Sequence, residues 1–101
     1  MKTLTLNERI DMGNEAGKLK DNPAFSYALE VLRESCYERL QAAPLKDTEG
    51  LTLIAQQLKV VNAFEAAVSG LVEGGKAAAH DWENLKARRD GFTERTLRRV
   101  L

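Results

Sequence analysis

The fold is decided by residues 22–75, which read NPAFSYALEVLRESCYERLQAAPLKDTEGLTLIAQQLKVVNAFEAAVSGLVEGG. Asn22 can accept a hydrogen bond as an N-cap, and Pro23 presets φ at the first helical position. A helix is therefore expected to run from here to about residue 41. Its apolar residues are three or four positions apart and so share one face: Phe25, Leu29, Leu32, Cys36 and Leu40.

A short connector around Pro44 follows. Proline stops the first helix, and Asp47 or Thr48 can cap the next one. This next helix is expected over residues 49–73 and to end at residues 74–75, because glycine takes the left-handed C-cap conformation without steric cost. A connection this short makes the two helices antiparallel neighbours, with Phe25 close to Phe64. The apolar face of the second helix comprises Leu51, Ile54, Leu58, Val61, Phe64, Val68 and Leu71.

The flanking segments also have helical character. Thr5 and Glu8 have the capping-box spacing, which predicts a short first helix. Gly13 and Gly17 weaken this helix, so we expect it to need a surface to lie on. After the glycine pair, residues 77–89 have helical propensity. The sequence thus predicts one small all-α domain with a short N-terminal helix and lead-in (residues 1–21), an antiparallel helical hairpin (22–75) and a basic C-terminal helical arm (76–101).

Size and composition fit a soluble chain of one domain. The 101 residues are 44% hydrophobic and 30% charged. Residues 86–101 hold six basic and two acidic residues, a net +4, which leaves −4 for the remainder of this neutral chain. The single Cys36 cannot form an internal disulfide, and we find neither a signal peptide nor an apolar run of the ~20 residues that span a bilayer. A reducing cytoplasm and no membrane partner are expected.

Residues 70–77, GLVEGGKA, have the glycine and lysine spacing of a phosphate loop. A phosphate loop also needs a preceding strand and a Ser or Thr after the lysine. Here a helix is expected to precede the segment, and Ala77 takes the place of the hydroxyl residue. We therefore interpret these glycines as the end of a helix and expect no nucleotide.

Other chemistry-bearing residues also favour structural interpretations. His80 has only carboxylates near it, whereas zinc sites recruit several His or Cys ligands. The acidic row of Glu30, Glu34 and Glu38 lacks the Glu-x-x-His pairs of di-iron bundles. Cys36 lies in the apolar stripe, which favours a packed thiol over a nucleophile. We expect no catalytic residue, no metal site and no cofactor, and therefore no enzyme.

The C-terminal arm is the segment with the strongest functional character, because arginines alternate there with aromatic and aliphatic residues. Arginine and aromatic residues are enriched at protein interfaces, and two facing helices alone bury too little surface for stability. Docking on protein, including further copies of this chain, is therefore expected. Nucleic-acid binding through the same positive charge is the alternative. The candidate partner-binding residues are Trp82, Leu85, Arg88, Arg89, Phe92, Arg95, Leu97, Arg98 and Arg99.

The hairpin also has a family resemblance. Its NPAF start at residues 22–25, its connector at residues 44–48 and its glycine pair resemble small helical-hairpin proteins encoded among the head and packaging genes of tailed bacteriophages. The resemblance implies a virion or head-assembly component with no catalytic residues, located in the virion or the host cytoplasm. Its implied partners are copies of itself and larger phage structural proteins. A small nucleic-acid-binding or DNA-packaging regulator that acts through the basic arm is the alternative.

Overall fold

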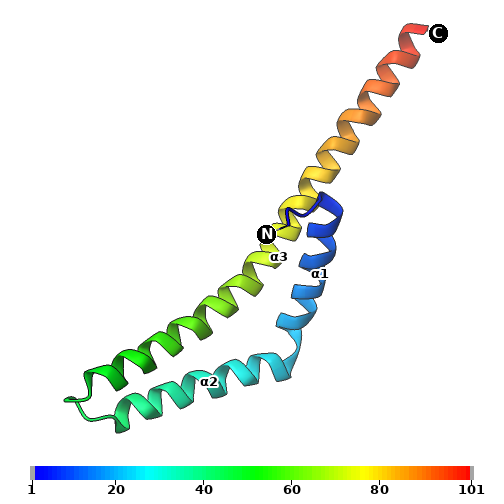
Figure 1. Ribbon diagram of the computed structural model, residues 1–101. Coiled ribbons are helices and arrows are strands. Elements are labelled where there is room, and N and C mark those ends of the chain that lie inside the picture. The colour runs from blue at the N-terminus through cyan, green and yellow to red at the C-terminus, as the bar shows by residue number, and fades with distance from the viewer. Residues whose placement is uncertain (1, 101) are drawn as a thin grey trace.

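The protein is all-α, as the sequence predicts. The structure, a computed structural model, describes the backbone of residues 2–100 and the side-chain surroundings of residues 2–91. It contains the helices α1 (Leu6–Asp21), α2 (Pro23–Ala42) and α3 (Thr48–Val100) (Figure 1). Over the described backbone no strand is present.

The helix starts are where the capping residues place them. Thr5 Oγ1 accepts a hydrogen bond from the Glu8 amide at 3.2 Å, and the Thr5 amide donates to the Glu8 carboxylate at 3.3 Å. Asn22 Oδ1 accepts from the Ala24 amide at 2.8 Å, and Pro23 is the first residue of α2. Asp47 Oδ1 accepts from the amide of Gly50 at 2.9 Å at the start of α3. All three predicted starts are therefore confirmed.

The predicted end of the helix at Gly74 and Gly75 is wrong. α3 continues through both residues as one helix of 53 residues. No glycine of the described chain has a positive φ, so neither takes the left-handed C-cap conformation. Alanines follow the pair, and their high helix propensity outweighs the penalty of two glycines.

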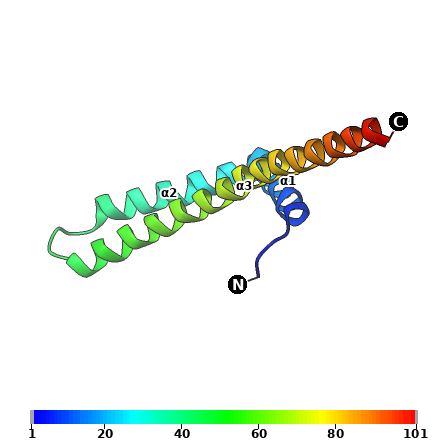
Figure 2. The same ribbon diagram turned by 90° about the horizontal axis from the view of Figure 1, so that it is seen from above.

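The molecule is elongated. It measures 82 × 26 × 18 Å, and its radius of gyration is 22.6 Å, against about 13 Å for a compact domain of 100 residues. α2 lies beside the first part of α3, α1 lies against the middle of α3, and the last part of α3 projects beyond both (Figures 1 and 2). The first helix, which is expected to need a surface to lie on, thus lies against α3.

An aromatic contact and a polar cluster join α2 to α3. The rings of Phe25 and Phe64 have centroids 5.9 Å apart, as predicted. Arg33 of α2 donates to Asn62 Oδ1 at 3.0 Å and forms an ion pair with Glu65. These contacts fix which faces of the two helices meet.

The buried core is small, because α1 and α2 each cover only a narrow strip of α3. Its apolar members are Ala16, Leu29, Cys36, Ile54, Val68 and Ala78. Other predicted core residues are half-buried, namely Phe25, Leu40, Leu51, Leu58 and Val61. The assignment of Leu32 and Phe64 to the core is wrong, since they are 51% and 52% exposed. Leu32 lies at the flank of α2, beside a groove that it lines with Leu53 and Val60.

Candidate functional site

α1 and α3 touch backbone to backbone at a pair of glycines. A Cβ atom built on Gly13 would lie 2.7 Å from the Cα of Gly75, and a Cβ built on Gly75 would lie 2.8 Å from the Cα of Gly13. Real Cβ atoms do not come this close, so both positions require glycine for this packing. Ala16 and Ala78 are buried close by. Small residues thus let the two backbones approach, and Gly75 of the phosphate-loop-like segment is part of a helix contact.

The sequence analysis missed this contact. The signal was present as small residues three positions apart, Gly13 with Ala16 on α1 and Gly75 with Ala78 on α3, all of them buried. Such spacing puts small residues on one face of a helix and is typical of closely packed helix pairs.

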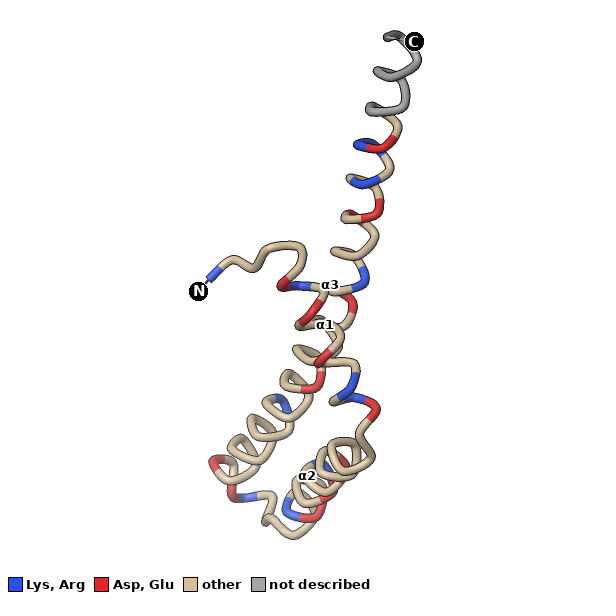
Figure 3. Tube along the Cα trace, turned by 90° about the vertical axis from the view of Figure 1, so that its right-hand side faces the viewer, with Lys and Arg blue, Asp and Glu red and all other residues tan. Residues whose placement is uncertain are grey.

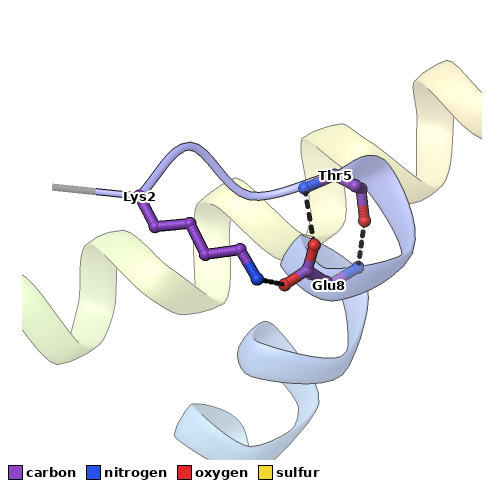
Figure 4. Close-up of polar contacts among 3 residues, drawn as sticks. All are labelled: Lys2, Thr5 and Glu8. Carbon is purple, nitrogen blue, oxygen red and sulfur yellow. Dashed lines mark hydrogen bonds and ion pairs between the residues drawn. The ribbon is translucent and has the colours of Figure 1, made fainter.

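The first turn of α1 is held by a polar cluster at its N-terminus. Lys2 Nζ lies 3.2 Å from Glu8 Oε2, and Thr5 bonds Glu8 through both its amide and its hydroxyl (Figure 4). The bond from the Thr5 amide, with the Lys2 ammonium second, holds the pKa of Glu8 below its usual value. The carboxylate form therefore favours the helical start of α1.

An open groove lies on one side of the contact between α1 and α3. It has a volume of about 520 Å³, and the backbones of Gly70 and Gly74 form part of its wall. Leu4, Met12 and Leu71 supply apolar side chains to it. A Cβ atom built on Gly70 or Gly74 would meet nothing within 4 Å, so the chain itself does not use the space next to these glycines.

The distal segment, defined here as residues 80–90 of α3, carries the predicted partner-binding residues whose side chains are described. Every residue of the segment is exposed. Trp82 and Leu85 are 42% and 51% exposed and lie one turn apart. Arg88 is also exposed, and Arg89 lies 3.8 Å from Asp90. The remaining predicted residues lie outside the described side chains: Phe92, Arg95, Leu97, Arg98 and Arg99.

Charge in the distal segment is mixed. Lys86, Arg88 and Arg89 are balanced there by Asp81, Glu83 and Asp90. Blue and red segments accordingly both occur along the projecting helix in Figure 3. Of the net charge of +3 on residues 76–101, Lys76 contributes +1 and the residues beyond Gly91 contribute +2.

The residues considered for chemistry are distributed along the chain. Cys36 is buried as predicted, with an Arg39 guanidinium nitrogen 3.5 Å from its sulfur. Glu30, Glu34, Glu38 and His80 are exposed. Across residues with described placement, no group of three or more His, Cys, Asp or Glu side chains is arranged to hold a metal ion. Within the same part of the chain, none of the helices combines the length and apolar character needed to cross a bilayer.

Comparison with known proteins gives no relative. No family model matches the chain, and no curated protein or solved structure matches it.

Proposed function

We propose that this chain is a non-enzymatic interaction protein that docks on a larger protein through the distal segment of α3. The observation that supports this is the exposure of Trp82 and Leu85 on a helix that projects past α1 and α2 (Figure 1). Large apolar side chains on a helical face are the usual anchors when a helix binds in a groove of another protein. In this proposal the helical hairpin and α1 serve as a support from which the distal segment projects.

The partner is proposed from the sequence resemblance, as a structural protein of a phage head or of its assembly machinery. Protein docking is favoured over nucleic-acid binding because the distal segment has as many acidic as basic residues. A nucleic-acid site would derive its affinity from excess positive charge.

The test is binding of the purified chain to candidate capsid, portal and connector proteins by cosedimentation. The double variant Trp82→Ala/Leu85→Ala should lose most of the binding, since truncating a buried aromatic anchor commonly weakens an interface by ~2 kcal/mol or more. The matched control is His80→Ala/Glu83→Ala, which changes two exposed residues on the other side of the same helical turns. All four side chains are exposed, so the helix content measured by circular dichroism should not change.

A second measurement tests whether the chain binds nucleic acid instead. Docking through apolar anchors should persist when salt is raised, whereas phosphate binding falls steeply with salt. Equal binding by the two double variants, together with salt-sensitive binding of DNA or RNA by the unmodified chain, would contradict the docking proposal.

A further inference from the structure

α3 has a second exposed surface, separate from the distal segment. We call it the open face, and it consists of Val60, Ala63, Phe64, Ala67, Gly70 and Gly74, all at helical spacings of three or four. None of these residues is charged, although 30% of the chain is. Val60 and Phe64 are among the exposed large hydrophobic residues of the molecule. Leu71 borders the face and is also exposed.

The open face is complementary to itself when a second copy runs in the opposite direction. If Ala67 of one copy meets Ala67 of the other, residues equally far before and after Ala67 come opposite each other. Phe64 and Gly70 each lie three positions from Ala67, and Val60 and Gly74 each lie seven. Ala63 and Leu71 each lie four positions away. A large side chain thus faces a small residue at each of these positions.

The groove described above fits this register. It lies against Gly70 and Gly74, where the second copy would place its Phe64 and Val60. Leu4, Met12 and Leu71 give the groove apolar walls that suit an aromatic ring, and Lys2, Thr3 and Arg9 line it as well. By symmetry, the first copy places its own Phe64 in the same groove of the second, as an isologous interface requires.

Charges beside the face favour opposite directions. Lys59 lies eight positions before Ala67 and Glu73 six after it, so an antiparallel pair brings them together twice. A parallel pair would instead set each of these residues beside its own copy, and like charges face to face are unfavourable.

We infer that a second copy of this chain binds the open face, as an antiparallel two-fold dimer centred on Ala67. This goes beyond the proposed docking function and uses other anchors than Trp82 and Leu85. In the dimer the two distal segments point to opposite ends.

The first test is the mass of the purified full-length chain in solution, by sedimentation equilibrium over a range of concentrations. The unmodified chain should be a dimer. Gly70→Gln/Gly74→Gln should shift it to monomer, because these side chains fill the space that Phe64 and Val60 of the other copy need. Within the chain the added Cβ atoms touch nothing, so the fold should not suffer. Gly91→Gln is the matched control, also at a helical glycine with open space but outside the face.

The second test fixes the register by disulfide crosslinking. Ala67→Cys should link two copies under mild oxidation, because residue 67 lies on the two-fold axis. Ala63→Cys should not, since its two copies would be about 12 Å apart along the helices, beyond the Cα separation of about 7 Å that a disulfide tolerates. Cys36 is buried, so the unmodified chain serves as the uncrosslinked control.

Each measurement can overturn the proposal. A chain that sediments as a monomer at all concentrations would exclude it, and so would a dimer that the Gly70 and Gly74 variant leaves intact. Equal crosslinking at positions 63 and 67 would indicate a parallel pair. Because only the purified chain is used, failure of docking to a larger protein does not affect these results.

Discussion

Gly74 and Gly75 are neighbours in one helix, yet their surroundings are opposite. Gly75 lies against the backbone of Gly13 in α1, and Gly74 faces open space. A glycine within a helix is unfavourable by roughly 0.5 to 1 kcal/mol relative to alanine. At Gly75 the close packing of α1 compensates for this penalty, whereas at Gly74 nothing in the single chain does.

The difference shows that glycine inside this helix acts as a contact surface. The covered side of α3 pairs small residues with the small residues of α1. The open face has the same character, with Ala63, Ala67, Gly70 and Gly74 exposed beside larger apolar side chains. The covered side of α3 packs against α1 of the same chain. The open face has the composition of a surface that binds another molecule.

The largest effect is expected at the covered glycine. Gly75→Ala places a methyl group 2.8 Å from the Cα of Gly13 and 3.1 Å from the carbonyl oxygen of Arg9. Both neighbours are backbone atoms, so a change of rotamer cannot relieve the clash and α1 must move. The free energy of unfolding should fall by about 1 to 3 kcal/mol, measured by urea denaturation and circular dichroism.

Gly17→Ala is the matched control for that experiment. Gly17 lies one turn after Gly13 on α1, and a Cβ atom there meets nothing within 4 Å. Alanine should be neutral or stabilising at this position. If both variants unfold at the same urea concentration, the contact between α1 and α3 is not as close as described.

A smaller effect of opposite sign is expected at the open glycine. Gly74→Ala improves helix propensity and touches nothing within the chain, so the monomer should gain roughly 0.5 to 1 kcal/mol of stability. Unfolding measured at several protein concentrations separates this gain from any change in dimerisation. A loss of stability in the monomer would mean that Gly74 has an intrachain contact and that the two glycines do not differ.

The beginnings of the helices could be predicted from sequence, because capping is local chemistry. Thr5 with Glu8, Asn22 with Pro23, and Asp47 each act on atoms within three residues. The end of α3 could not be predicted in this way. Glycine permits a C-cap without requiring one. In addition to the alanines that follow it, Gly75 has a packing partner, Gly13, which is 62 positions away in the chain.

The sequence predicted only part of the buried core correctly, because burial also depends on contacts between distant parts of the chain. Apolar spacing identified Leu29, Cys36, Ile54 and Val68, which are buried. It also included Leu32 and Phe64, because spacing gives the direction of a side chain but not the width of the strip that a neighbouring helix covers. Trp82 and Leu85 are exposed in the single chain, so they are available for the partner that we propose.

The smallest effect on stability is expected at the start of α1. The capping box there stabilises the first turn of the helix that covers Gly75. The pKa of Glu8 is lowered chiefly by the bond from the Thr5 amide, and then by Lys2 and the Thr5 hydroxyl. A lowered pKa means that the folded state favours the carboxylate. This contribution to stability is complete above the usual glutamate pKa and is lost as the pH falls through the lowered value. Acidification through that range should therefore loosen the first turn of α1.

NMR titration of the Glu8 side chain measures this directly. In the unmodified chain its pKa should lie below the usual glutamate value, and in Thr5→Ala it should move back toward that value, because the capping hydroxyl is absent and the first turn frays. Thr3→Ala, outside the capping box, should leave the pKa unchanged. Amide hydrogen exchange in the first turn of α1 should quicken in Thr5→Ala and, below the lowered pKa, in the unmodified chain after correction for the intrinsic pH dependence of exchange. Should the pKa of Glu8 be the same in all three proteins, the capping box does not anchor α1, and the cover over Gly75 must rest on the packing with Gly13 alone.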